Sequence, residues 1–327
     1  MQMTAAFIPA YGSPDKIRVR STARPEPKKD EVLIRVMASG VTKADTMMRS
    51  GTPFLARLMV GFPRPRHPIL GTGYAGIVTE VGADVTGFRV GDRVYGNAGL
   101  TFGANADYVT VKQSELIVPM PDGLSFEDAA PLTDGALTSL TFLQDIAHLQ
   151  PGQRILIIGA TGALGAAAVQ IAKSMGAHVT GTARAANFGF LRDLGADEVI
   201  DHGIRNVRQM TGQYDVIYDT PGVAPFRSTR HLLTPKGLYM SPVLGCDLMF
   251  QMLMTRRSKG RRAVFSATGL RSVAQQRPLC DQINEMMTSG KLRGLVEHRF
   301  PLTDAARAHA LVDAGHKRGN VVLTSAA

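Results

Sequence analysis

An apolar, β-branched run, Ile155 to Ile158, ends in three glycines that recur at every third position: Gly159, Gly162 and Gly165. An alanine-rich segment of helical character and a second apolar stretch follow, so the expected order is strand, turn, helix, strand. In such a unit the first glycine permits a tight turn, the second lets backbone N–H groups approach a pyrophosphate, and the third lets the helix pack closely on the strand. A helix N-terminus also attracts phosphate. The pattern predicts a dinucleotide site, although its spacing is not the commoner G-x-G-x-x-G.

The turn after the second strand indicates which dinucleotide binds. Between Gly176 and Asp193 there is no acidic residue to meet a ribose hydroxyl, and Thr182, Ala183 and Arg184 occupy the turn. A carboxylate there would repel a 2′-phosphate, whereas an arginine fork suits phosphate oxygens. We therefore expect NADP(H) rather than NAD(H), with Arg184 as a solvated loop residue being the alternative. The cofactor contacts expected from this unit are Gly159, Thr161, Gly162, Ala163, Leu164, Gly165, Thr182 and Arg184.

Composition bounds the class of protein. The 327 residues are 44% hydrophobic and 20% charged, enough for two domains of ordinary size. No apolar run reaches membrane-spanning length, no secretory signal is visible at the N-terminus, and we expect a cytoplasmic protein without a membrane partner. The net charge of +10 is mostly dispersed and its one cluster, Arg256 to Arg262, has no interleaved aromatics, so we expect no nucleic-acid partner. Two cysteines support neither a disulfide framework nor a zinc site.

The elements that must position these residues change character along the chain. Residues up to about 120 read as short strands separated by turns, and Gly82, Gly87 and Gly91 mark the corners of a compact barrel. From Pro121 onwards helices and strands alternate, beginning with a helix capped by Ser125, and this alternation predicts a parallel sheet. We expect RRAVFSATG to form an edge strand and NVVLT the last strand. The Met-rich segment from Leu248 to Met254 is interpreted as adaptable apolar packing beside a cleft or a subunit interface.

Several segments in order resemble the medium-chain dehydrogenase/reductase superfamily: EVLIRVMASGV, GTGYAGIVTEVG, VGDRVYG, GATGALG, LGADEVID and GHKRGNVVLT. The resemblance covers nearly the whole chain. It implies an α/β protein with a GroES-like β-barrel catalytic domain over residues 1–122 and a Rossmann doubly wound parallel sheet that binds NADP over 123–266. Residues 267–327 would form a helix and then return to the catalytic domain.

Members of this superfamily differ in whether they bind zinc. The three positions at which zinc-dependent members place ligands are matched here by Thr42, Thr72 and Asp134. Two neutral hydroxyls and one carboxylate make a poor zinc site. The chain therefore resembles the zinc-independent branch, the quinone oxidoreductases and enoyl or enone reductases, and we expect no bound metal, NADPH as cofactor, and a quinone or enone as substrate.

Hydride addition to such a substrate builds charge on an oxygen that needs a donor. The resemblance points to Thr42, Tyr74 and Asp134 as candidate catalytic residues, with a barrel-core role for Tyr74 and a helix cap for Asp134 as alternatives. The family motif V-N-P-x-[DE]-x-x-x-R-x-G reads VTKADTMMRSG here, without its Asn and Tyr. An NADPH-binding structural or interaction protein with little turnover therefore stays an alternative, and an alcohol dehydrogenase a less favoured one.

The resemblance adds further expectations. It assigns cofactor contacts outside the glycine turn to Lys43 at the pyrophosphate, Thr138, and Lys173 at the 2′-phosphate, with a solvated lysine on the helix face as the alternative for Lys173. Arg318 and Asn320, where relatives close over the cofactor, are weaker candidates. It also implies a homodimer formed through the edge strand, with Val264 and Phe265 at its centre.

Overall fold

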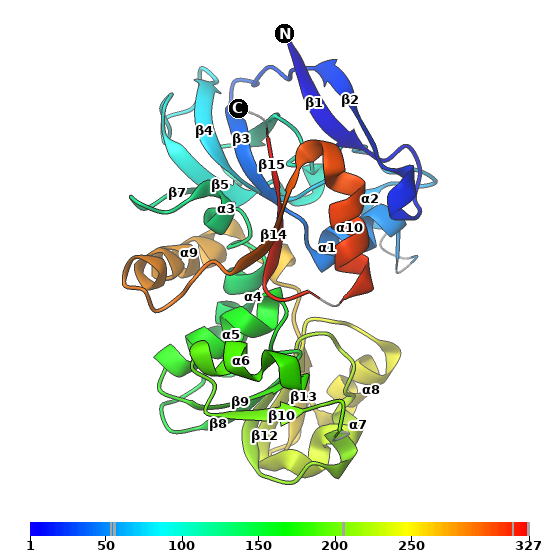
Figure 1. Cartoon of the computed structure of the whole chain (residues 1–327), viewed down its shortest axis with the longest axis vertical. Coiled ribbons are helices and arrows are strands. Elements are labelled where there is room, and N and C mark those ends of the chain that lie inside the picture. The colour runs from blue at the N-terminus through cyan, green and yellow to red at the C-terminus, as the bar shows by residue number, and fades with distance from the viewer. Residues whose placement is uncertain (53, 55–56, 205–206, 316, 326–327) are drawn as a thin grey trace. The chain divides into compact units, whose positions relative to one another are not determined.

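The computed structural model describes residues 1–52, 54, 57–204, 207–315 and 317–325. Its elements divide into two compact units. Unit 1 comprises Met1–Asp134, Ser272–Thr288 and Arg293–Ala327, and unit 2 comprises Gly135–Arg271 and Ser289–Leu292. Figure 1 labels the elements along the chain. The first segment of unit 1 ends at Asp134, which is one of the candidate catalytic residues.

Unit 1 is built on a seven-stranded sheet. Its path runs β14-β15-β3-β4-β5-β7, and β6 pairs with β3 beside it. The strands are β3 (Glu31–Gly40), β4 (Gly73–Val81), β5 (Arg93–Asn97), β6 (Tyr108–Lys112), β7 (Leu116–Pro119), β14 (Val296–Pro301) and β15 (Asn320–Thr324), with a separate hairpin of β1 (Gln2–Phe7) and β2 (Arg18–Ala23). Alternating side chains such as Val32, Ile34 and Val36 close the core, which confirms the predicted GroES-like barrel.

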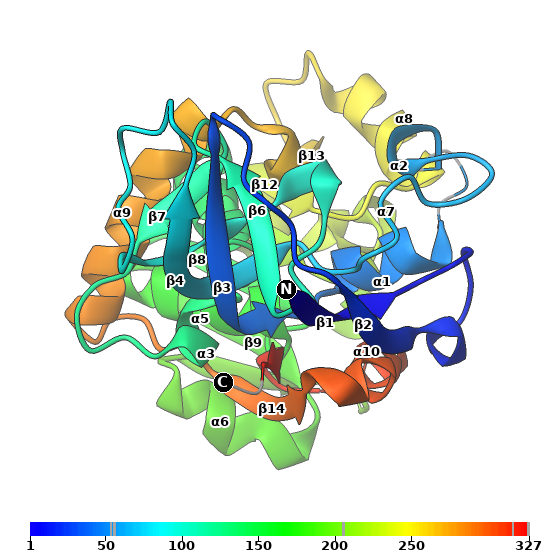
Figure 2. The ribbon, with the colours of Figure 1, turned by 90° about the horizontal axis from the view of Figure 1, so that it is seen from above.

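The helices of unit 1 lie outside its strands. They are α1 (Lys43–Ser50), α2 (Arg57–Val60), α3 (Phe126–Ala129), α9 (Val273–Thr288) and α10 (Ala305–Ala314). Helix α9 packs against β7, and α10 packs beside β14 (Figure 2). The predicted cap of α3 is confirmed, because the Ser125 hydroxyl accepts a hydrogen bond from the Asp128 N–H at 3.1 Å.

Unit 2 is a six-stranded sheet in the order β10-β9-β8-β11-β12-β13. All five strand pairs are parallel, as the alternation of helices and strands predicts. The strands are β8 (Arg154–Ile158), β9 (His178–Ala183), β10 (Glu198–Asp201), β11 (Tyr214–Asp219), β12 (Leu233–Ser241) and β13 (Arg262–Phe265). This is the Rossmann order, and the expected position of β13 at a sheet edge is confirmed.

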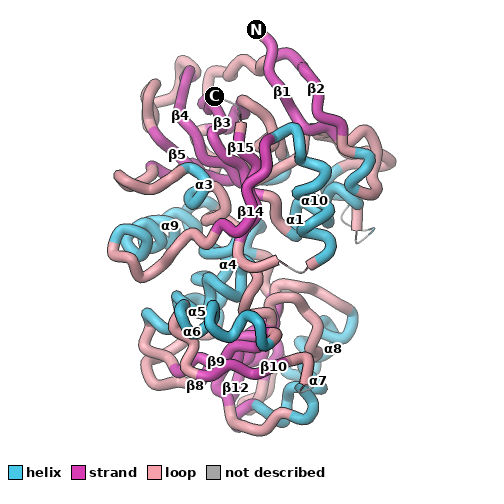
Figure 3. Tube along the Cα trace, viewed as in Figure 1, coloured by secondary structure: helices cyan, strands magenta, loops and turns pink. Residues whose placement is uncertain are grey.

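Five α-helices accompany the described strands of unit 2: α4 (Gly135–Leu140), α5 (Ala163–Ser174), α6 (Phe188–Asp193), α7 (Phe226–Thr229) and α8 (Cys246–Thr255). Helix α4 continues as a π-helical turn over Thr141–Ile146. Helices α5 and α6 flank strands β8, β9 and β10 (Figure 3). Short 3₁₀ turns complete the two units at Pro14–Lys16, Gly99–Thr101, Ala185–Asn187, Val207–Gln209, Arg230–Leu232, Thr268–Leu270 and Leu302–Asp304. Within the described part of the chain, no helix has the length and apolarity needed to cross a membrane.

Candidate functional site

The glycine turn of unit 2 has the close approaches that its sequence predicts. Gly159 has φ +72°, a backbone conformation that side chains rarely adopt, and a Cβ there would lie 2.7 Å from Pro221. A Cβ on Gly165 would lie 2.2 Å from the Gly159 carbonyl oxygen, so α5 packs directly against the turn. Gly162 is the N-cap of α5, and no described side chain caps that end. The first N–H groups of α5 are thus left for a ligand, which fits a dinucleotide pyrophosphate.

The other residues expected at this turn gather around it. Thr161, Ala163 and Leu164 are partly exposed at the start of α5. The Thr182 hydroxyl, at the end of β9, accepts a hydrogen bond from the Gly159 N–H at 3.2 Å. Thr138 lies on α4, whose next residue, Ser139, donates to the Leu164 carbonyl at 2.8 Å. These hydrogen bonds connect α4 and the end of β9 to the glycine turn within unit 2.

Arg184 lies exposed directly after β9, at the carboxyl end of the strand. Lys173 lies elsewhere. It is near the carboxyl end of α5, and its Nζ donates to Asp197 Oδ1 at 2.5 Å. The same Asp197 carboxylate accepts from the N–H of Val179 at the beginning of β9. Because α5 runs antiparallel to the strands, Lys173 lies beside the amino ends of the strands, whereas Arg184 lies at their carboxyl ends. The expected role of Lys173 at the 2′-phosphate does not fit this geometry.

Asp219 lies at the carboxyl ends of the strands, beside the glycine turn, and was not predicted from the sequence. It ends β11, is fully buried, and accepts hydrogen bonds from the N–H groups of Gly222, Val223 and Ala224 at 2.7–3.2 Å. The Tyr239 hydroxyl donates to it at 3.0 Å. Burial raises the pKa of Asp219, while these donors favour its charged form. The carboxylate thereby shapes the loop that contains Pro221, which lies against Gly159.

A second cluster lies in unit 1, around the buried carboxylate of Asp45. Thr42 is the N-cap of α1, and its hydroxyl accepts from the Asp45 N–H at 3.1 Å while donating to Asp45 Oδ2 at 2.7 Å. The Thr42 N–H donates to the same oxygen at 2.9 Å, which completes a capping box. Thr72 donates its hydroxyl to Asp45 Oδ1 at 3.1 Å. Burial raises the pKa of Asp45, and the hydrogen bonds from Thr42 and Thr72 oppose that rise.

Helix α1 is held in place by an ion pair one turn further on. Arg49, 1% exposed, donates to the Gly12 carbonyl and to the carboxylate of Asp313 on α10. A fully desolvated guanidinium needs such partners, because an unpaired buried charge is costly. The pair fixes the side of α1 that carries Asp45.

Asp134 adds an acid to this cluster. Its burial, together with the nearby negative charge of Asp45, raises the pKa of the Asp134 carboxyl to about 7, although Lys317 lowers it. Burial in turn lowers the pKa of Lys317, whose Nζ donates to the Gly319 carbonyl at 2.5 Å. A carboxyl with a pKa near neutrality can deliver a proton at physiological pH. Sequence reasoning chose Arg318 and Asn320 from this segment and missed Lys317.

Tyr74 does not reach this cluster. Its side chain is fully buried in the core of the barrel, and its hydroxyl donates to the Leu116 carbonyl at 3.3 Å. Burial raises its pKa far above the ordinary value. The expectation that Tyr74 donates to a substrate is therefore wrong in this structure, and the barrel-core alternative describes it.

The remaining predicted contacts are engaged within unit 1. The Lys43 ammonium is largely exposed, 4.0 Å from Asp313 Oδ1. The Asn320 amide donates to the Gly294 carbonyl at 2.7 Å, and Arg318 pairs with Glu297 at 2.7 Å. These bonds order the segment before β15 around Lys317.

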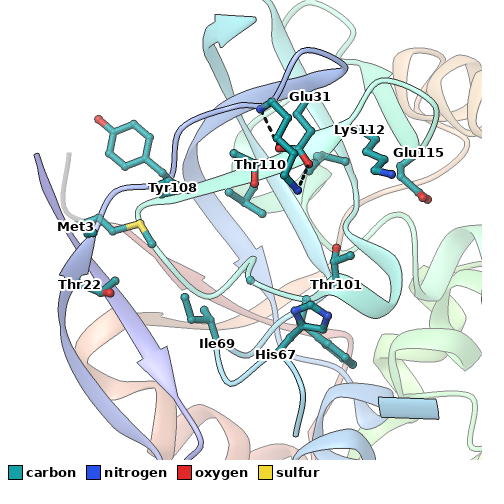
Figure 4. A pocket seen from close by; sticks show the side chains of 17 residues that line it. Met3, Thr22, Glu31, His67, Ile69, Thr101, Tyr108, Thr110, Lys112 and Glu115 are labelled. Carbon is teal, nitrogen blue, oxygen red and sulfur yellow. Dashed lines mark hydrogen bonds and ion pairs between the residues drawn. The ribbon is translucent and has the colours of Figure 1, made fainter. Parts of the chain in front are cut away.

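A separate cavity of about 470 Å³ lies between the β1–β2 hairpin and β6 of the barrel (Figure 4). Its lining includes Met3, Thr22, Ile69 and Tyr108, with Lys28 and Glu31 paired at its rim. None of the predicted site residues lines it. The cavity is thus distinct from the Asp45 cluster.

The three positions matched with zinc ligands thus gather in one place. Thr42 and Thr72 both bind the Asp45 carboxylate, and Asp134 is within its electrostatic influence. Among the described residues, no group of three or more His, Cys, Asp or Glu side chains is arranged to hold a metal ion.

Comparison with known proteins agrees with this architecture. Residues 28–122 match the alcohol dehydrogenase GroES-like domain family, and residues 194–323 match a family described as zinc-binding dehydrogenase. A quinone oxidoreductase of Pseudomonas aeruginosa is 32% identical over 333 residues, covering 96% of this chain and 97% of its own. The solved quinone oxidoreductase of Coxiella burnetii superposes with a TM-score of 0.87 at 28% identity, over 99% of each chain. A mycobacterial protein solved with NADPH has a TM-score of 0.83 at 27% identity, over 98% of this chain and 99% of its own.

The fold and the glycine turn define a nicotinamide-dependent oxidoreductase of two units. The chain belongs to the medium-chain dehydrogenase/reductase superfamily, and it is quinone oxidoreductase-like within that superfamily. The expected cofactor, NADPH, is confirmed by this kinship.

Proposed function

We propose that this protein is a zinc-independent NADPH-dependent reductase of quinones or α,β-unsaturated carbonyl compounds, in which Asp134 supplies the proton. The observation that carries the proposal is the placement of the Asp134 carboxyl within the electrostatic influence of Asp45 and Lys317, where desolvation and the Asp45 charge raise its pKa to about 7. A carboxyl whose pKa lies near neutrality is available in its protonated form at physiological pH, which suits a general acid.

Bound NADPH supplies the hydride in this chemistry. The residues of this chain do the rest. The glycine turn and the open end of α5 hold the pyrophosphate, and Arg184 pairs with the 2′-phosphate. As negative charge develops on the substrate oxygen, the protonated Asp134 donates its proton, and Lys317 stabilises the carboxylate that remains.

Thr42 does not act as the hydrogen-bond donor to the substrate that the sequence predicted. Its hydroxyl proton is committed to Asp45, so it keeps only acceptor capacity. We propose that Thr42 and Thr72 hold Asp45 charged, and that this charge keeps Asp134 protonated. Both threonines are positioning residues in this account.

Zinc independence rests on the donor set. The Thr42 and Thr72 hydroxyls are neutral and already donate to Asp45, which leaves a hard, sparse set of oxygens where zinc prefers imidazole or thiolate. Chelator treatment of untagged protein should leave NADPH oxidation and the thermal midpoint unchanged. Stoichiometric zinc in elemental analysis, with activity lost on chelation, would contradict this.

The competing function is an NADPH-binding structural or interaction protein with little turnover, favoured by the absence of the family's Asn and Tyr from VTKADTMMRSG. NADPH oxidation with 9,10-phenanthrenequinone and with a medium-chain enone separates the two. Our proposal predicts turnover with at least one of these substrates. Tight NADPH binding without turnover on either class would favour the competing function.

We also propose a cytoplasmic homodimer whose partner is a small-molecule substrate rather than nucleic acid. The free thiols of Cys246 and Cys280 suit a reducing compartment. The edge position of β13 supports pairing with a second copy.

A further inference from the structure

Helix α8 presents an apolar face to solvent. Leu248 and Gln251 are buried where the helix packs against β13, whereas Met249 (53%), Phe250 (49%), Leu253 (70%) and Met254 (65%) are exposed. These four residues are spaced i, i+1, i+4 and i+5, so they share one side of the helix. Val243 and Leu244, just before the helix, are also exposed. Contiguous exposed apolar side chains of this size mark an interaction surface.

The chain that follows the apolar face is strongly basic. Arg256, Arg257, Lys259, Arg261 and Arg262 place five positive charges in seven residues. The sequence has no Asp or Glu between Asp247 and Asp281, so nothing in that stretch offsets them. Asp247 itself faces Arg227 at 3.2 Å, and the Arg227 guanidinium lies over the Phe250 ring.

From this arrangement we infer that α8 and its basic segment dock this protein peripherally on an anionic membrane surface. Apolar side chains of a short helix enter the boundary between headgroups and acyl chains, and an adjacent run of Lys and Arg binds the acidic headgroups. A second copy of this chain would cover the apolar face but would bring a like net charge of +10 to the basic run, which disfavours it as the occupant. The inference revises the sequence-based expectation of no membrane partner, which rested on the lack of a spanning run.

The test is sedimentation of the purified full chain with vesicles. Equal parts phosphatidylcholine and phosphatidylglycerol are compared with phosphatidylcholine alone, at low and high salt. We predict binding to the anionic vesicles only, weakened by salt because the Lys and Arg contacts are screened. The double variants Leu253→Glu/Met254→Glu and Arg256→Glu/Arg257→Glu should each weaken it about tenfold or more.

Single charge changes at exposed sites of unit 1 serve as controls for a general loss of positive charge. Val90→Glu introduces an acid at an apolar side chain that is 65% exposed, and Lys29→Glu reverses an exposed charge. Both should bind as the wild type does. Thermal midpoints and NADPH binding show that every variant is folded.

Two outcomes would overturn the inference. The first is failure of the wild type to bind anionic vesicles, and the second is binding that the α8 and basic-segment variants leave unchanged. If Leu253→Glu/Met254→Glu instead lowers the molar mass in light scattering while wild-type protein ignores vesicles, the α8 face is an interface between copies. The test does not depend on turnover, so the proposed function and this inference fail independently.

Discussion

The Thr42 hydroxyl donates to the Asp45 carboxylate at 2.7 Å while accepting from the Asp45 backbone N–H at 3.1 Å. At the position where zinc-dependent relatives are expected to have a metal ligand, this chain has a helix cap. The hydroxyl stabilises α1 and the charge of Asp45 together.

The first prediction concerns this cap. Thr42→Ala should lower the free energy of unfolding by about 1 kcal/mol, the ordinary worth of an N-cap side chain. Thr42→Ser keeps the hydroxyl and should lose much less. Because Thr42 also holds Asp45 charged, Thr42→Ala should lower the apparent pKa of the turnover profile, whereas Thr42→Ser should not. Urea denaturation and pH profiles measure the two effects, and a stability unaffected by Thr42→Ala would argue against the cap.

Asp134 predicts the pH dependence of turnover. With a pKa of about 7, its donating form is depleted above neutrality, so kcat should be level in mildly acidic buffer and fall as pH rises through 7. Asp134→Asn should lower kcat by about 10²–10³-fold and remove this dependence. A variant with wild-type kcat and an unchanged profile would exclude Asp134 as the donor.

The same carboxyl has a consequence for stability. Its folded pKa is raised, so the fold disfavours the charged form, and stability is lost as pH rises from about 4 towards 7. Asp134→Asn should therefore stabilise the protein at pH 8 but not at pH 4. Because the Asp134 side chain is only partly buried, solvent screens the effect, and we expect about 1–2 kcal/mol. Equal thermal midpoints for the two proteins at pH 8 would contradict this.

The preference for NADPH over NADH distinguishes the roles of Arg184 and Lys173, which lie at opposite ends of the strands. NADPH should bind about 10-fold more tightly than NADH, equivalent to about 1.4 kcal/mol. Arg184→Ala should remove most of that preference by weakening NADPH alone. Lys173→Ala is the matched control, since its ammonium pairs with Asp197, and it should leave the preference intact. Fluorescence titration decides, and the reverse pattern would restore Lys173 to the phosphate site.

The edge strand predicts the oligomeric state. β13 has one neighbour, β12, in the described sheet, and its free edge offers backbone groups to a second copy. Val264→Pro would remove a ladder donor at the expected centre and should shift the protein towards monomer. Light scattering should give twice the chain mass for wild type. A wild-type monomer, or a dimer untouched by the substitution, would place any interface elsewhere.

Local sequence predicted what local physics controls. Glycine spacing predicted the turn, the Ser125–Asp128 spacing predicted the helix cap, and the alternation of helices and strands predicted the parallel sheet with its edge strand. The structure contains all three. Lys173 was assigned to the 2′-phosphate by the resemblance alone, whereas in the structure it lies near the carboxyl end of α5 and pairs with Asp197. Tyr74 was misjudged because a strand residue faces either the core or solvent, and the choice depends on pairing register.

The cluster around Asp45 could not be predicted, because its residues are distant from one another in the sequence. Asp45 gathers hydroxyls from Thr42 and Thr72, and Asp134 and Lys317 influence each other across more than half of the chain. The motif VTKADTMMRSG contains Asp45, but nothing in its spacing shows that Thr72 or Asp134 is near. Folding was needed to show that the matched zinc positions surround a carboxylate.

Transfer of deuterium from NADPH labelled at the nicotinamide C4 tests the central claim most directly. With a medium-chain enone in water, hydride addition and protonation of the oxygen by Asp134 give an enol, which tautomerises to the saturated ketone. Our account therefore predicts one deuterium at the β-carbon of the product and one solvent proton at the α-carbon. The same experiment with Asp134→Asn should retain the site of labelling while product forms far more slowly. A hydroquinone keeps no label, because deuterium on its oxygens exchanges with water, so the quinone is followed by NADPH oxidation instead. Absence of both labelled enone product and quinone-dependent NADPH oxidation, under conditions where NADPH binds, would contradict reductase function.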